Sequence, residues 1–134
     1  MEFDEVVGPY VYCHCRSCKK ASGSAFAANV AVPITSFRIA SGSELISRFE
    51  SSAGKYRHFC SRCGSPLYAT VGEAPQSVRV RLGTLDSEFS ASPSAHIFMN
   101  HKAAWERVED SLPQYGEWPP LGNIAIHGSK QGLD

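Results

Sequence analysis

Cys13-His14-Cys15-Arg16-Ser17-Cys18 places three cysteines within six residues. Alternate residues of an extended strand share a face, so Cys13 and Cys15 point together while His14 points away. A turn after the strand would bring Cys18 back to the same place. The spacing therefore predicts that three thiolates can converge on one metal ion, and zinc is the default metal for such a site.

The remaining two cysteines form a second cluster, Cys60-Ser61-Arg62-Cys63-Gly64. Two thiols three residues apart chelate through a tight turn, and Gly64 can take the positive φ that such a turn needs. A redox dithiol is the alternative, but no strand-to-helix pattern of the thioredoxin type follows Cys63. We predict that all five cysteines are metal ligands. Five is one more than a closed zinc site needs and two fewer than one closed and one open site together.

The composition is that of an ordinary globular domain, and we expect residues 1–134 to form one zinc-binding domain. Thirteen basic and thirteen acidic residues give zero net charge, so no electrostatic case exists for a nucleic-acid or anionic membrane partner. The acidic start does not resemble a signal peptide, and no apolar run approaches the roughly 20 residues of a membrane span. The odd number of cysteines argues against a disulfide framework, so we expect a cytoplasmic protein.

Alternating patterns predict an all-β fold. Residues 77–82 place Val78, Val80 and Leu82 on one face and two arginines, Arg79 and Arg81, on the other, where we expect solvent. Residues 25–32 carry Phe and Val on one face and only Ala and Asn on the other, which would let a sheet or a ligand approach closely. Further short strands are predicted at 9–12, 37–39, 45–49, 56–59, 66–69 and 95–98.

Helix is predicted to be scarce. One or two turns are expected at Arg16–Ala21, a short turn at Val32–Ser36, and a longer helix at His101–Asp110 with Trp105 as a core anchor before an irregular tail from about 114. Asp86 fits a turn as well as a site. The histidines are scattered and are read as isolated groups, with His96 as a candidate for a pocket wall; they are His14, His58, His96, His101 and His127.

Several ordered motifs resemble those of the glutathione-dependent formaldehyde-activating enzymes, the family that also includes centromere protein V. The resemblance covers roughly residues 8 to 115 and rests on segments 13–24, 37–42, 59–67, 83–86, 96–98 and 102–105. It implies a β-tent fold, in which small antiparallel sheets are pinned by zinc. It also implies two zinc sites: an open one matching Cys13, Cys15 and Cys18, and a structural one in which Cys60 and Cys63 join an upstream Cys-x-Cys pair.

The activity that the resemblance implies is that of a carbon–sulfur lyase, which joins glutathione to formaldehyde and gives S-hydroxymethylglutathione. The expected partners are thus a small thiol and an aldehyde. One alternative is a non-catalytic binding module whose zinc only holds the sheets together. Another is a different zinc-dependent lyase or a thiol carrier that uses the same site.

The sequence departs from the family pattern in one place, because the upstream Cys-x-Cys-Gly pair is absent. Glu2–Val6 resembles the strand that normally follows that pair. Either the natural start lies upstream, or the chain is a shortened member with a rebuilt metal site. In the second case one zinc draws on both clusters, or Cys60 and Cys63 bind no metal.

Overall fold

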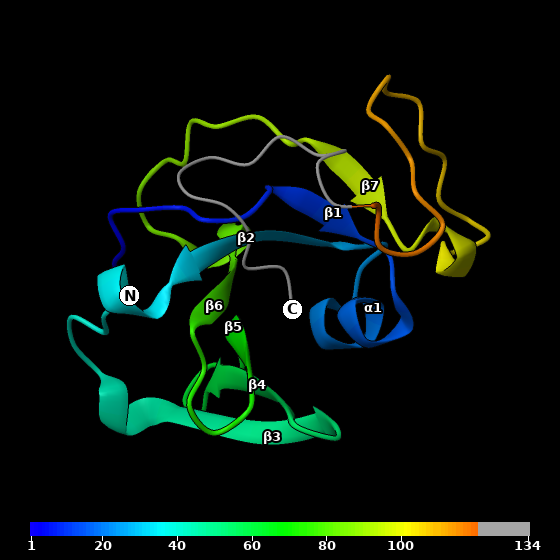
Figure 1. Cartoon of the computed structure of the whole chain (residues 1–134). Helices are drawn as coiled ribbons and strands as arrows, with labels where there is room; N and C mark the ends of the chain where they lie inside the picture. Colours follow the sequence, from blue (N-terminus) through cyan, green and yellow to red (C-terminus); the bar gives the residue numbers. More distant parts are fainter. Residues whose placement is uncertain (121–134) are drawn as a thin grey trace.

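One seven-stranded sheet dominates the computed structural model, which describes residues 1–120 (Figure 1). The strand order is β3-β4-β5-β6-β2-β1-β7. The strands are β1 Val11–Cys13, β2 Ala27–Pro33, β3 Ile46–Ser52, β4 Lys55–Cys60, β5 Pro66–Val71, β6 Ser77–Arg81 and β7 Ala95–Ile97. The predicted all-β class is confirmed, although the strands join in one hydrogen-bonded sheet and not in several small ones.

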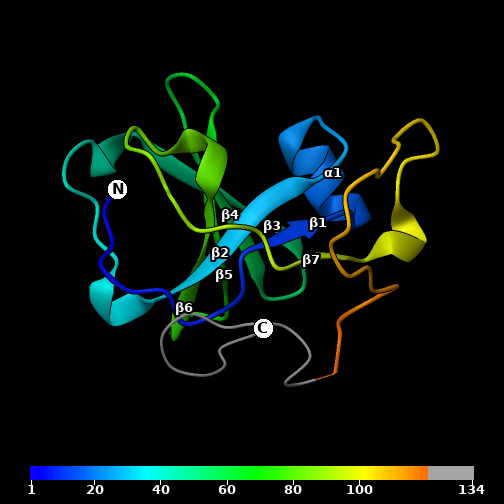
Figure 2. The same cartoon turned by 90° about the horizontal axis from the view of Figure 1, so that it is seen from above.

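The sheet is antiparallel except at one edge, where β1 and β7 pair in parallel and Tyr12 lies opposite His96. This pairing brings residues 11–13 beside residues 95–97. The sheet bends strongly: β2 and β3 run across the view of Figure 1 at two levels, and β5 and β6 run between them. The N-terminal part of the chain follows the β2 side of the sheet (Figures 1 and 2).

The main apolar core lies between β2 and β6. Val30 faces Val80 and Val32 faces Val78 in the antiparallel register, and none of the four is exposed to solvent. Aromatic side chains from the first ten residues and from the loop after β6 pack against this cluster. The predicted alternation of both strands is therefore confirmed for its apolar face.

The opposite face of β6 corrects the prediction that Arg79 and Arg81 are solvated, because they are only 4% and 7% exposed. Arg79 lies opposite Ala31 of β2 and Ala69 of β5, and Arg81 lies opposite Asn29. These small neighbours leave room for two long side chains to lie along the sheet. The small-residue face expected on β2 is thus filled by arginines of the adjacent strand.

A single α-helix, α1 at Arg16–Ser22, follows β1 directly, as the sequence predicted. Cys15 is its N-cap and accepts a hydrogen bond from the Cys18 backbone through its sulfur, at 3.3 Å. Gly23 ends the helix in the left-handed conformation, with φ of 65°, which a glycine adopts at little cost. The predicted helical turn after β2 is also present, at Ile34–Ser36.

Two predictions for the second half of the chain are wrong. Only a 3-10 turn, Met99–His101, forms where a helix was expected at His101–Asp110, and the side chain of Lys102 bonds the carbonyl oxygens of Ala103 and Glu106 instead. Trp105 is 72% exposed and anchors no core. The apolar residues at helical spacing, Trp105, Val108 and Leu112, are exposed or only half-buried, so little apolar burial would stabilise a helix there.

Smaller differences concern single segments. The strand expected at 37–39 is reduced to one bridge between Arg38 and Glu2. Residues 114–120 contain no helix or strand, and the backbone of Tyr115 bonds His96 and Met99 at the edge of β7. The rest of the predicted irregular tail lies outside the described residues. Within the described residues, no helix has the length and apolar character needed to cross a membrane.

Candidate metal centre

The three cysteines of the first cluster come together in space. Cys13 ends β1, Cys15 caps α1, and Cys18 lies in the first turn of that helix. Their sulfur atoms all lie within 4.8 Å of one another, and Cys13 and Cys18 are buried. The strand-to-helix junction therefore gathers the three thiols without any contribution from distant parts of the chain.

This donor set fits zinc. A tetrahedral zinc with Zn–S distances of about 2.3 Å separates its sulfurs by roughly 3.8 Å, which is compatible with three sulfurs that all lie within 4.8 Å of one another. Three thiol donors and no carboxylate or imidazole donor in the cluster favour a soft or borderline metal over Mg²⁺ or Ca²⁺. Three protein ligands leave one position of a tetrahedral ion for another molecule.

The surroundings of the cysteine cluster favour negative charge on one of its sulfurs. Hydrogen bonds from the thiols of Cys13 and Cys15 lower the pKa of Cys18, and the positive charges of Arg81 and Arg57 lower it further. The pKa of Cys13 is raised, first by its hydrogen bonds to the other two sulfurs. The two guanidinium groups thus favour a thiolate at Cys18.

A cavity of about 210 Å³ opens beside the sulfurs. Four cationic side chains line it, from β4 and β6, and two aromatic side chains, Phe98 and Trp118, form part of its wall. No Asp or Glu is among the lining residues, all of which belong to the described part of the chain. The four cations are Lys55, Arg57, Arg79 and Arg81.

One buried hydrogen-bond chain connects Arg81 to the sulfur of Cys18. Arg81 donates from Nη1 to Oδ1 of Asn29 at 2.7 Å, and the Asn29 amide nitrogen lies 3.9 Å from the Cys18 sulfur. Burial lowers the pKa of Arg81, while the negative charge of Cys18 raises it. Asn29 therefore fixes the orientation of Arg81 next to the thiol cluster.

The second cysteine cluster lies elsewhere. Gly64 has φ of 81° and donates its backbone N–H to Cys60, which confirms the predicted tight turn. Cys60 and Cys63 line a separate cavity of about 370 Å³ together with Asp86, and the Cys63 thiol donates to Ser65 at 3.3 Å. Among the described residues, the clustered metal-ligand candidates include the first three cysteines and not this pair.

Sequence reasoning missed a buried polar chain behind the cluster. His14 turns away from the sulfurs, as expected, and its Nε2 lies 2.8 Å from Nδ1 of His96. His96 in turn bonds the Asp110 carboxylate, at 2.9 Å. Both rings are almost fully buried, and burial lowers the pKa of His14 to about 4. The parallel pairing of β1 with β7 brings His14 next to His96. A pairing between strands so far apart in the chain cannot be predicted from a local sequence pattern.

The other histidines considered in the sequence analysis are not part of the cysteine site. His58 stacks on Tyr68 and bonds Thr70, and His101 is exposed beside Glu117, while His127 lies outside the described residues.

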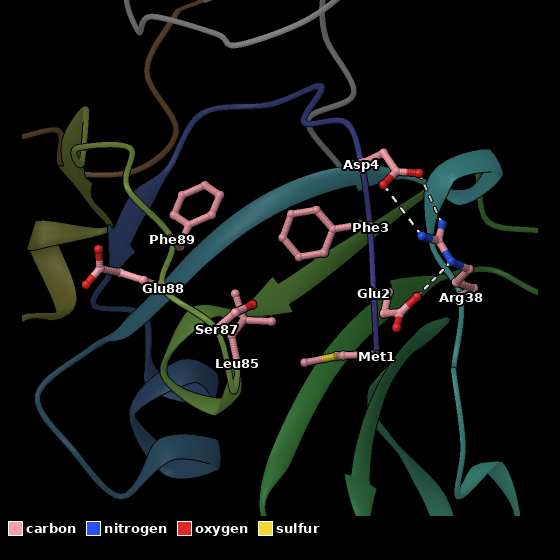
Figure 3. A pocket seen from close by; sticks show the side chains of 9 residues that line it. All are labelled: Met1, Glu2, Phe3, Asp4, Arg38, Leu85, Ser87, Glu88 and Phe89. Atoms are coloured by element: carbon pink, nitrogen blue, oxygen red, sulfur yellow. Dashed lines mark hydrogen bonds and ion pairs between the residues drawn. The ribbon is translucent and has the colours of Figure 1, made fainter.

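A third cavity, about 350 Å³ in volume, lies at the N-terminal segment, where Phe3 and Phe89 point toward its interior (Figure 3). Its arginine, Arg38, is paired with Glu2 and Asp4 at 3.0 and 3.2 Å. The positive charge of Arg38 is therefore already matched by acidic side chains. Among the described residues, no cysteine lines this cavity.

Comparisons with known proteins identify the family of this chain. The pattern of the family described as "Glutathione-dependent formaldehyde-activating enzyme" matches residues 1–101. A Halomonas elongata protein named "Putative glutathione-dependent formaldehyde-activating enzyme" is 30% identical over 116 residues, covering 78% of this chain and 73% of that protein. A crystal structure of a Rhodobacter sphaeroides protein is similar at 20% identity and a TM-score of 0.49, covering 64% of this chain and 81% of the other. By its sequence match over residues 1–101, this chain belongs to the glutathione-dependent formaldehyde-activating enzyme family.

Proposed function

We propose that Cys13, Cys15 and Cys18 hold a zinc ion beside an open cavity, and that the protein adds glutathione to formaldehyde as a carbon–sulfur lyase. The observation that carries this proposal is the convergence of three sulfurs, within 4.8 Å of one another, at the wall of a cavity lined by cations. When bound, zinc supplies the Lewis acidity that keeps an added sulfur ligand in its thiolate form at neutral pH.

The residues of the chain perform the remaining tasks. The guanidinium groups of Arg57 and Arg81 favour an anionic sulfur in the cavity, because they lie close enough to lower the pKa of Cys18. The wall formed by Phe98 and Trp118 excludes water from one side. The cationic lining also stabilises the negative charge that develops on the aldehyde oxygen during the addition.

The reaction balances without a redox partner. The thiolate sulfur of glutathione bonds to the carbon of formaldehyde, the C=O π-bond breaks, and its electron pair moves to oxygen. The proton lost by the thiol is returned to that oxygen, which gives S-hydroxymethylglutathione. We place this reaction in the cytoplasm, where thiols stay reduced.

The separation of the two cysteine clusters favours this proposal over a purely structural metal. A closed four-cysteine site would leave no position for a substrate, whereas Cys60 and Cys63 line a cavity of their own. Cys60 and Cys63 remain proposed as ligands of a second metal.

The test compares wild type with Cys15→Ser and with Cys63→Ser as the matched control. Serine is itself a good N-cap, so Cys15→Ser keeps the cap of α1 while it removes a metal ligand. We expect wild type to carry zinc and to consume formaldehyde in a glutathione-dependent manner above the no-protein rate. Cys15→Ser should lose the activity together with the zinc of the first cluster, whereas Cys63→Ser, which removes a proposed ligand of the second metal, should keep the zinc of the first cluster and the glutathione-dependent reaction. Equal rates for wild type and the no-protein control would refute the enzymatic claim.

A further inference from the structure

The two edges of the seven-stranded sheet differ in how they are covered. At the β7 edge, the backbone of residues 113–117 bonds His96, Phe98 and Met99 and so covers the strand. At the other edge, β3 pairs with β4 alone, and no other strand among the described residues lies beside it. Figure 1 shows β3 as the outer border of the sheet. An uncovered edge strand presents a row of unpaired N–H and C=O groups to any chain that can pair with it.

The strand β3 lacks the features that commonly protect an exposed edge. It is seven residues long, whereas protected edge strands are usually very short, and it contains neither proline nor lysine. The four consecutive residues 47–50 are exposed to solvent, and Phe49 among them is 49% exposed. The irregular register of the β3–β4 pair falls after Glu50, so residues 46–50 are regularly paired with β4. The outer side of β3 is therefore available to a partner strand.

The sequence of β3 is complementary to itself in the antiparallel direction. When two copies pair with Phe49 at the two-fold axis, Arg48 of each copy lies opposite Glu50 of the other. Opposite charges directly across two strands stabilise the pair, and two facing aromatic rings do the same. Ser47 then faces Ser51, so no position of the strand places like charges opposite each other.

The same charges disfavour the neighbouring registers. Directly opposite side chains of paired strands share a face, so a symmetric pair can shift only by placing another residue of β3 on the two-fold axis. A shift in one direction places Arg48 opposite Arg48 of the second copy, and a shift in the other direction places Glu50 opposite Glu50. Like charges directly opposite are destabilising. The charge pattern therefore specifies one register for a second copy of the same strand.

Contacts within the chain hold both charged side chains at the edge and leave them accessible. The Arg48 guanidinium lies 4.1 Å from the centre of the Tyr56 ring and 3.8 Å from the Glu73 carboxylate, and its side chain is still 48% exposed. Glu50 accepts the Gly54 backbone N–H at 2.7 Å through Oε2, which leaves Oε1 for a second donor. Both side chains are thus oriented and can each accept a partner across the strand.

We propose that β3 is a docking edge for a second copy of this chain, which pairs antiparallel through residues 46–52 with Phe49 at the two-fold axis. The sheet of one copy then continues into the sheet of the other. Seven residues a side are far fewer than the roughly 20–30 of a standard interface, so the dimer is weak, with a dissociation constant of about 10 µM to 1 mM. This inference goes beyond the proposed thiol chemistry and does not depend on it.

The test measures the mass of the full chain by sedimentation velocity from about 1 µM to 1 mM, the range that a weak interface requires. The protein is kept reduced because its five cysteines are free and could cross-link two copies. We expect the wild-type mass to rise toward that of a dimer as the concentration increases. Arg48→Glu and Glu50→Arg each place like charges opposite one another and should weaken self-association by at least about tenfold.

A mixture of these two variants tests the register directly. The Arg48→Glu chain carries two negative side chains at the edge and the Glu50→Arg chain two positive ones, so one copy of each restores opposite charges at both positions. The equimolar mixture should associate as strongly as wild type, although neither variant does so alone. Arg107→Glu is the matched control, because it makes the same charge change at an 85% exposed side chain outside β3. Alone it should self-associate like wild type, and mixed with Glu50→Arg it should not form the strong mixed dimer.

The remaining outcomes are also decisive. A wild-type chain that stays monomeric up to about 1 mM overturns the inference, and so does a dimer that is unchanged by both charge reversals. A mixture that associates no more than its separate components overturns it as well. If either variant fails to fold by circular dichroism, Phe49→Lys takes its place, because it puts two like charges at the two-fold axis. Loss of the dimer in this variant supports the inference, and retention of the dimer overturns it.

Discussion

Replacing His96 by phenylalanine removes the central member of the buried chain that joins His14 to Asp110. His96 is 2% exposed and has hydrogen-bond contacts at 2.8 Å to His14 and 2.9 Å to Asp110. Phenylalanine fills the space of the ring but bonds neither partner. His14 then has no partner at either nitrogen, because its Nδ1 already lacks one. Asp110 is half exposed and returns to water.

The expected destabilisation follows from these contacts. A net hydrogen bond contributes about 0.5–1.5 kcal/mol, and a buried group left without a partner costs about 1–3 kcal/mol. His96→Phe should therefore lower the free energy of unfolding by about 2–4 kcal/mol. His101→Phe is the control, since His101 is exposed and a surface change usually stays within about 0.5 kcal/mol.

The assay is urea denaturation followed by circular dichroism, with zinc at one fixed concentration because a bound ligand shifts apparent stability. A double variant, His14→Phe with His96→Phe, replaces both partners by apolar rings and should cost less than the sum of the single variants. The reasoning is refuted if His96→Phe lowers the free energy of unfolding no more than His101→Phe does. It is also refuted if the double variant loses as much free energy as the two single variants together.

Three further results are expected. Gly23→Ala should destabilise by about 1 kcal/mol because φ is 65° there, whereas Gly83→Ala, with equal space and no positive φ, should stay near zero in thermal denaturation. Asn29→Ala leaves the buried Arg81 without its acceptor and should cost about 1.5–3 kcal/mol, measured by urea denaturation. The hydrogen bond from His96 lowers the pKa of Asp110 below its unfolded value of 3.8. The ionised carboxylate therefore stabilises the fold at pH values above this unfolded pKa, and the stabilisation is lost as the pH falls through the lower folded pKa. The stability difference between wild type and Asp110→Asn should accordingly shrink between pH 6 and pH 3, and a constant difference would contradict it.

Local patterns predicted the part of the site that is local in sequence. Cys13, Cys15 and Cys18 converge because a strand and a helix follow each other directly, and strand period and helix capping are properties of short segments. The tight turn at Gly64 was predictable for the same reason.

The charged wall of the cavity was not predictable, because it depends on register between strands. Alternation placed Arg79 and Arg81 correctly on one face of β6, but whether that face meets water depends on what lies opposite. Ala31 and Asn29 lie opposite, and they turn a polar strand face into a buried one. The helix expected at His101–Asp110 shows the opposite case. The helical spacing of apolar residues was present, but Trp105 stays exposed, so its burial does not stabilise a helix.

The three cysteines are close together in the sequence, and this affects the order in which the site forms during folding. Residues 13–18 form so short a loop that gathering their thiols costs little chain entropy even before the sheet exists. A metal ion can therefore be captured by the nascent chain soon after Cys18 is made, well before β4 and β6 bring their arginines. Affinity for the unfolded chain also reduces how much the metal stabilises the native state. The arginine-rich wall then folds around a charge that is already in place.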